Sequence, residues 1–205
     1  MRFPAPTINS RLFAYVIPAM LIVAFTVQGW AEVVYTPVHV SIPVNQSYNI
    51  DVDGNGNTDF TLTSKLIQAY CQSGDEYIWS LTVTAGNGDA VMIELDHIGL
   101  PLAVALPAGA QVNSGQAFYP GASMMAELYW GQCSTGAGGE WLNTPNRYLG
   151  LRFQEAGGNV HYGWMQLSTA AFVDQHQHLQ TSVFVSGYAY ETIAGQGILT
   201  GQLSR

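Results

Sequence analysis

Apolar and polar residues alternate along several short segments of the chain, and this pattern constrains the fold more than any other feature. Leu149, Leu151 and Phe153 occupy every second position, and residues 33–42 and 90–96 show the same period. Successive side chains of a strand point to opposite faces, so this period indicates strands that are buried on one face. Glycine-rich turn signals separate the segments. The sequence therefore predicts an all-β fold, and more specifically a single antiparallel β-sandwich of the jelly-roll type.

The composition agrees with a folded β protein and excludes several other classes. Only 10% of the 205 residues are charged, whereas 48% are hydrophobic. A coiled coil would be rich in Glu, Lys and Arg, and a disordered chain would lack this much apolar surface. The formal net charge is −8. Because such a surface repels phosphate backbones, we expect no nucleic-acid partner.

The N-terminal segment has the order of a secretory signal. Two arginines precede an uncharged apolar run at residues 12–27, and small residues follow at Gly29 and Ala31. This pattern predicts that residues 1–31 are a signal peptide cleaved after Ala31. The alternative is an uncleaved membrane anchor. We expect one mature domain, residues 32–205, with no membrane span after cleavage, located outside the cell or in a periplasm.

The two cysteines, Cys71 and Cys133, both follow the predicted signal. Disulfides persist in exported proteins, and two cysteines allow a single pairing. Closing a loop of this length stabilises a fold by about 4 kcal/mol in the chain-entropy model. No reactive-cysteine signature surrounds either residue, which argues against a cysteine nucleophile. We therefore predict a Cys71–Cys133 disulfide.

One acidic stretch has the spacing of calcium ligands. Oxygen-bearing side chains stand at its first, third, fifth and ninth positions, glycine stands at the sixth, and the seventh can offer its main-chain carbonyl. This matches the first nine places of an EF-hand-type loop, in which glycine permits the sharp turn. The predicted ligands of a Ca²⁺ ion are Asp51, Asp53, Asn55, Asn57 and Asp59.

The acidic stretch also departs from an EF-hand. Leu62 stands at the twelfth position, where an EF-hand has a bidentate Glu, and the flanking residues 48–50 and 60–63 have strand character. We therefore expect a structural ion between strands, with a dissociation constant of about 0.1–1 mM, as in extracellular modules. The alternative is an Asx-rich turn that holds no ion.

Two other polar groups have weaker spacing. Asp174, His176 and His178 would share one strand face and could hold zinc or copper, but the lack of an apparent fourth ligand favours a polar loop tip. Glu94 and Asp96 would also share a face, as an acid–base pair could, although solvent-facing carboxylates are the simpler interpretation. Nucleophile-elbow, P-loop and zinc-protease motifs are absent from the sequence. We expect a protein that is not an enzyme.

Aromatic residues are numerous, with 11 Tyr and 5 Trp. Exposed rings can stack on sugar faces or anchor an interface. The candidate ligand or interface aromatics are Trp130, Trp141, Tyr162 and Trp164. The alternative for each is an ordinary place in the core.

Three motifs in the C-terminal half follow one another in a recognisable order: Tyr-Leu-Gly-Leu-Arg-Phe at 148–153, His-Tyr-Gly-Trp-Met at 161–165 and Gly-Tyr-Ala-Tyr-Glu-Thr at 187–192. This order resembles uncharacterised secreted bacterial proteins related to those with a PEP-CTERM-type sorting tail. The chain differs from the sorted members because residues 201–205 hold no Pro-Glu-Pro motif or apolar tail. The resemblance implies export and a β-sandwich, and it carries no catalytic residues.

These features favour a secreted, calcium-stabilised, non-catalytic surface or matrix protein that binds a glycan or another extracellular partner, or itself. A second possibility is a subunit of an extracellular filament or layer, in which residues 32–43 are donated as a strand to a neighbour. A third is a secreted polysaccharide-active hydrolase.

Overall fold

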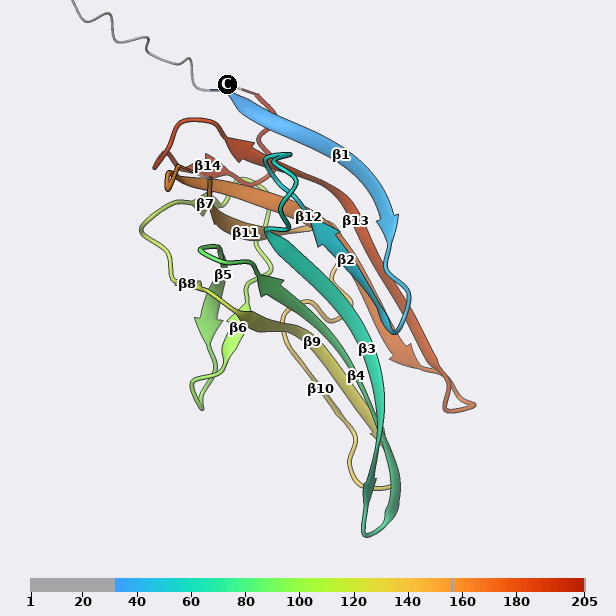
Figure 1. Ribbon diagram of the computed structural model, residues 1–205. Helices are drawn as coiled ribbons and strands as arrows, with labels where there is room; N and C mark the ends of the chain where they lie inside the picture. Colours follow the sequence, from blue (N-terminus) through green and yellow to red (C-terminus); the bar gives the residue numbers. More distant parts are fainter. Residues whose placement is uncertain (1–31, 156, 205) are drawn as a thin grey trace, which may run out of the picture.

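The fold is all-β, as predicted. The computed structural model describes residues 32–155 and 157–204 (Figure 1), so the predicted signal peptide, residues 1–31, lies outside the described residues. The described part contains no helix long and apolar enough to cross a membrane. The strands are β1 (Val33–Ser41), β2 (Gln46–Ile50), β3 (Phe60–Cys71), β4 (Gly74–Ala85), β5 (Ala90–Leu95), β6 (Pro101–Ala103), β7 (Gln111–Val112), β8 (Phe118–Tyr119), β9 (Ala122–Gly131), β10 (Gly136–Gly138), β11 (Arg147–Gln154), β12 (Val160–Val173), β13 (Leu179–Glu191) and β14 (Ile198–Leu199).

Twelve strands form one sheet, in the order β1-β13-β12-β11-β5-β6-β9-β4-β3-β2, with β8 beside β5 and β10 beside β9. All of its pairs are antiparallel except β6–β9. Figure 1 shows the sheet curled, so that the β1–β13–β12 side lies over the β3–β4–β9 side. Hydrogen bonds continue from one side to the other through β5 and β6. The structure therefore shows one large curled sheet, with β7 and β14 paired in a separate two-stranded sheet, and the jelly-roll arrangement is not confirmed.

The main core lies between the two sides of the curled sheet. Leu149, Leu151 and Phe153 of β11 are fully buried there, as their alternation predicts. Leu81 and Val83 of β4 meet them from the opposite side and are equally buried. Because this cluster draws on strands from both sides of the sheet, its burial holds the curl closed.

A second apolar cluster covers the outer face of β11 and β12. Tyr148 and Trp164 pack there with Leu106, Val112 and Ile198, which come from the segments around β7 and β14. The neighbouring positions of β11 are consequently buried on both faces, and its burial pattern is continuous over residues 148–151. This explains why alternation alone describes β11 incompletely.

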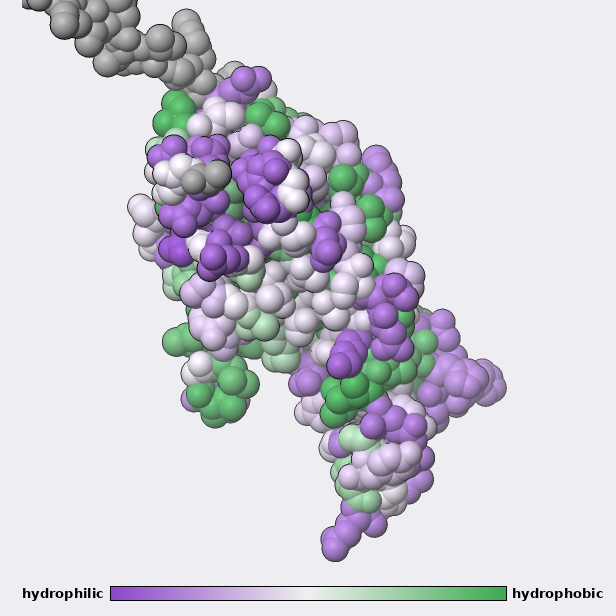
Figure 2. Space-filling view, in the orientation of Figure 1, coloured by the Kyte–Doolittle hydropathy of each residue, from purple (hydrophilic) through white to green (hydrophobic). Residues whose placement is uncertain are grey.

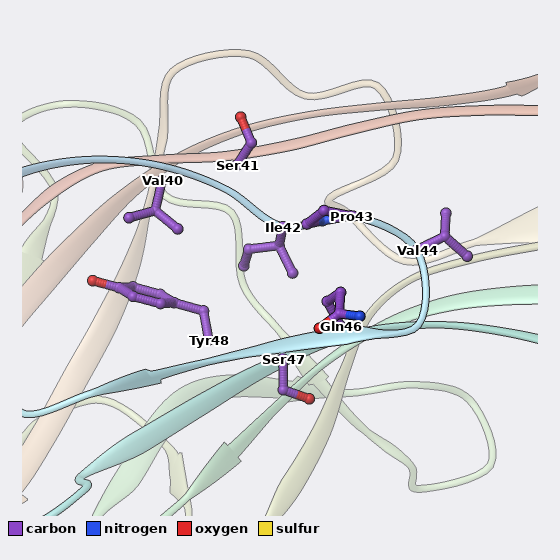
Figure 3. A pocket seen from close by; sticks show the side chains of 8 residues that line it. All are labelled: Val40, Ser41, Ile42, Pro43, Val44, Gln46, Ser47 and Tyr48. Carbon is purple, nitrogen blue, oxygen red and sulfur yellow. The ribbon is translucent and has the colours of Figure 1, made fainter.

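Strands β1 and β2 are the two ends of the strand order, and residues 42–45 connect them directly. Figure 3 shows the space between them: Val40 and Ile42 on one side and Tyr48 on the other line a hollow of about 340 Å³. The segment considered for donation to a neighbour forms β1, which pairs with β13 of the same chain, with a bulge between Pro37 and Val40. In this structure it completes its own sheet.

The predicted disulfide is present. Cys71 at the end of β3 is bonded to Cys133 beyond the end of β9, with 6.1 Å between their Cα atoms. The bond ties the tip of the β3–β4 hairpin to the connection between β9 and β10. A disulfide of this kind is typical of proteins outside the reducing cytosol.

Candidate metal centre

The predicted calcium loop is the connection between β2 and β3. These strands pair antiparallel up to Ile50 and Phe60, and the Asp59 amide donates to the Ile50 carbonyl at 2.9 Å. The strand pairing therefore closes both ends of the segment 51–59. The eight residues between Ile50 and Asp59 have to turn back within this short span, and Gly54 and Gly56 do so with φ of 74° and 89°.

Three of the five predicted ligands come together. Asp51, Asp53 and Asp59 each place one carboxylate oxygen within 4.8 Å of the others. Oxygens that bind a common Ca²⁺ at about 2.3–2.6 Å are separated by no more than about 5 Å, so this spacing is compatible with one ion. Within residues 32–155 and 157–204 this is the only group of three or more acidic, His or Cys ligands with such spacing.

Main-chain amides of the loop hold the carboxylates in place. Asp51 Oδ1 accepts hydrogen bonds from Gly54 and Asn55 at 2.8 and 3.0 Å, and its Oδ2 accepts one from Gly56 at 2.7 Å. Asp53 accepts from the main chain and the side chain of Asn55. These bonds fix the direction of each carboxylate and leave further lone pairs for a cation.

The other two predicted ligands, Asn55 and Asn57, do not join the cluster of three carboxylates. Asn55 Oδ1 accepts a hydrogen bond from the Asn57 amide at 2.8 Å. Both side chains are exposed and border a neighbouring cavity of about 320 Å³. The structure therefore brings together Asp51, Asp53 and Asp59, and places Asn55 and Asn57 at the rim.

Asp59 is the buried member of the triad, with 4% of its surface exposed. Its Oδ2 accepts a hydrogen bond from the Val52 amide at 2.6 Å. Burial raises the pKa of Asp59 to about 6, against the opposing effect of that hydrogen bond, and the negative charge of Asp89 adds to the rise. A bound cation would offset both the burial and the repulsion.

Asp89, which is not among the predicted ligands, is the second buried carboxylate at this place. It lies in the β4–β5 turn, is 3% exposed and accepts a hydrogen bond from the Gln154 amide at 3.0 Å. Burial raises its pKa as well. Asp59 and Asp89 border the same cavity. Their proximity depends on strand pairing far along the chain, so ligand spacing in the sequence could not reveal it.

Gly86 allows the two turns to approach so closely. Its amide donates to the Asp59 carbonyl, and a Cβ at this position would lie 2.7 Å from the Thr58 carbonyl oxygen and 2.9 Å from Asp89 Oδ2. Any larger residue would push the β4–β5 turn away from the loop. The sequence of residues 86–89 indicates a turn. In the structure this turn also packs against the acidic loop.

The other polar candidates have local structural roles. Asp174 Oδ1 accepts hydrogen bonds from the His176 and His178 amides, which caps the tip of the β12–β13 hairpin as the loop interpretation expects. Asp96 Oδ1 accepts from two amides of the β5–β6 connection. The carboxylate beside Glu94 is Glu140, whose charge raises the Glu94 pKa. Glu94 is exposed, as the solvent-facing interpretation expects, and its neighbouring carboxylate is that of Glu140.

The four candidate aromatics are buried, so the interpretation as exposed ligand or interface rings is wrong for Trp141, Tyr162 and Trp164. Trp141 and Trp164 are 0% and 2% exposed, and Trp130 and Tyr162 are both 5% exposed. The core alternative explains Trp141, Tyr162 and Trp164, because inward-facing strand positions place large rings in the two clusters. Trp130 differs because it also borders surface hollows.

No protein-family model matches the chain, and neither a curated protein nor a solved structure matches it. The functional assignment therefore depends on the chain's own residues and their geometry.

Proposed function

We propose that this is an exported, calcium-stabilised and non-catalytic β protein that binds an extracellular glycan or protein at a cell surface or in a matrix. The observation that carries the proposal is the convergence of Asp51, Asp53 and Asp59 within 4.8 Å of one another, with Asp59 buried. Oxygen ligands of this type and charge suit a hard divalent cation.

The position of the triad supports a structural role for the ion. The loop joins β2 to β3, its carbonyl at Asp59 receives the amide of Gly86, and Tyr188 of β13 reaches the carbonyl of Asp51. An ion at this point would hold together elements from both sides of the curled sheet. The disulfide and the acidic composition support export to a compartment where Ca²⁺ is abundant.

An exposed apolar tip supports contact with a partner. Leu95, Ile98 and Leu100 in and around the β5–β6 connection are 63%, 69% and 51% exposed. Figure 2 shows the same region as a hydrophobic projection at the lower left of the molecule. Asp96 satisfies the amides of Ile98 and Leu100, so this tip is ordered by its own hydrogen bonds. Clustered apolar side chains on a projecting turn are typical of contact surfaces.

The proposal is tested by calorimetric titration of the secreted protein with Ca²⁺ and Mg²⁺, together with thermal unfolding in Ca²⁺ and in EDTA. Calcium at about ten times its dissociation constant would stabilise the fold by about 1.4 kcal/mol, which corresponds to a rise in Tm of a few degrees. Asp53→Asn should remove the effect. Asp75→Asn, at the far end of the β3–β4 hairpin, is the matched control. Identical melting curves in Ca²⁺ and EDTA would contradict the calcium assignment.

A further inference from the structure

A groove runs across the end of the molecule between the β3–β4 hairpin and the β12–β13 hairpin. It consists of two hollows of about 430 and 410 Å³ that share Trp130 and Gln177 in their lining. Tyr77 and His178 border the first hollow, and Leu142 and Asn143 border the second. Figure 2 shows hydrophobic surface between the two projecting hairpins. Each hollow is within the size range of small-molecule sites.

Trp130, which lines both hollows, carries a hydrogen-bond donor that no other described residue uses. Its ring stacks on Tyr77, with 5.6 Å between the ring centroids. The Trp130 residue is 5% exposed, and its Nε1 atom is buried with no hydrogen-bond partner among the described residues. Trp79 and Trp141 donate through Nε1 to Ser64 and to the Ala103 carbonyl. Trp164 Nε1, in the second core cluster, resembles that of Trp130 and is buried without a partner in the described part of the chain. A buried donor without a partner costs free energy, and a ligand acceptor would recover it.

Gln177, the other shared residue, has an unusual backbone conformation. Its φ is 64°, whereas the other positive-φ residues besides glycine in the described ranges are all Asn. Asp174 imposes this turn, because its carbonyl accepts from the Gln177 amide and its side chain accepts from two neighbouring amides. Glycine or asparagine would suit the position better. A side chain kept at such a cost, between two hollows, indicates a binding role.

The chemistry of the lining selects a class of ligand. The residues that border the two hollows include no Asp, Glu, Lys or Arg. They combine aromatic rings with the amides of Asn143 and Gln177 and the hydroxyls of Tyr129 and Thr135. Rings and uncharged hydrogen-bonding groups match a neutral ligand that has apolar faces and many hydroxyls. An acidic polymer would also be repelled by the net charge of −8.

We propose that this groove binds a neutral oligosaccharide, with one sugar ring in each hollow and Trp130 and Gln177 between them. The inference rests on the proposed extracellular binding function and names its ligand class and its site. The groove is distinct from the calcium loop, since the two share no residue. Calcium stabilisation and sugar binding can therefore fail independently.

The test applies the full secreted chain to an array of neutral α- and β-linked hexose, pentose and N-acetylhexosamine oligosaccharides, and then measures affinity by calorimetry and tryptophan fluorescence. Hexagalacturonic acid and an uncharged ten-residue peptide serve as the competing ligand classes. We expect a neutral oligosaccharide of at least two rings to bind and the other two to fail. Absence of binding to every neutral sugar, or tighter binding of the acidic sugar or the peptide, would overturn the proposal.

Two variants probe the groove without relying on disruption of the fold. Gln177→Gly relieves the backbone conformation and should retain the wild-type Tm. Trp130→Phe removes the Nε1 donor but also shrinks a buried ring, so we expect a lower Tm, and its sugar affinity is measured at a temperature where the variant is fully folded. Each should weaken sugar binding by about fivefold or more, the effect of one lost hydrogen bond. Gln175→Gly, on the same hairpin tip but outside the groove, is the matched control. Wild-type affinity in both groove variants would also reject this site.

Discussion

The hydroxyl of Tyr188 donates a hydrogen bond to the main-chain carbonyl of Asp51 over 3.2 Å. Tyr188 belongs to β13, and Asp51 begins the acidic loop after β2. The bond therefore crosses from one end of the strand order toward the other. It gives the acidic loop a direct connection to the strand that holds β1.

Removing this hydroxyl should weaken both the fold and the ion's effect. Tyr188→Phe keeps the ring in its place in the core and deletes one hydrogen bond, so we expect a loss of about 1 kcal/mol in the free energy of unfolding. Calcium should also raise Tm less than in the wild type, because Asp51 loses its link to β13. Urea denaturation with and without Ca²⁺ measures both quantities. Tyr70→Phe, on a side chain that is 79% exposed, should change neither.

Asp59 predicts a pH dependence of stability in the ion-free protein. Its pKa is about 6 when folded and near the ordinary value of 3.8 when unfolded, so the folded state binds more protons between these values. The free energy of unfolding should therefore fall as the pH rises from about 4 to about 6, by up to about 3 kcal/mol. Asp89, whose pKa burial also raises, acts in the same direction. Denaturation in EDTA across this pH range measures the slope.

The same carboxyl makes calcium binding sensitive to pH. Protons and Ca²⁺ compete for Asp59, so calcium should raise Tm more at pH 7.5 than at pH 5. Asp59→Asn should flatten the pH dependence, since the amide can still accept the hydrogen bond from Val52 but cannot ionise. A larger calcium effect at pH 5 than at pH 7.5 would be incompatible with Asp59 as a ligand.

Asp89 should influence the ion through its charge. Asp89→Asn removes one source of the raised Asp59 pKa, so the ion-free protein should become more stable at pH 7.5. Calcium affinity should decrease about three- to tenfold, because the site loses negative charge. Calorimetry compares the dissociation constants, with Glu127→Gln as the remote control. An unchanged dissociation constant for Ca²⁺ would contradict a contribution from Asp89 and would leave the β2–β3 loop as the only source of ligands.

The disulfide should make a large contribution to stability. It closes a loop with a sequence separation of 62 residues, for which the chain-entropy model gives about 4 kcal/mol. The Cys71→Ser/Cys133→Ser double variant should therefore unfold at a clearly lower urea concentration than the oxidised wild type. Reduced wild type should match the double variant. A variant that unfolds at the wild-type midpoint would show that the bond contributes nothing.

The local features of this molecule could be predicted from its sequence. The alternation of Leu149, Leu151 and Phe153 identifies the inward face of β11. Because the chain has only two cysteines, a single disulfide is possible. The acidic loop can be recognised because its candidate ligands all lie within nine residues of the sequence. In each case the relevant contacts are close in sequence or have one possible partner.

Features that depend on distant pairing could not be predicted. Alternation places Tyr148 on the outer face of β11 and predicts that it is exposed to solvent. The segments around Val112 and Ile198 cover it instead. Asp89 joins Asp59 only because the β4–β5 turn is packed on the loop through Gly86. The groove around Trp130 likewise forms between hairpins that are far apart in sequence. Residue periodicity contains no information about these neighbours.

The pairing of β1 with β13 has a consequence for how the chain matures. Tyr35 lies opposite Ala189, so β1 pairs with a strand that lies far along the sequence. This edge of the sheet cannot be completed until β13 has been synthesised, and contacts this remote in sequence form slowly. Until then β1 lacks the strand it pairs with, so its pairing is a late step of folding.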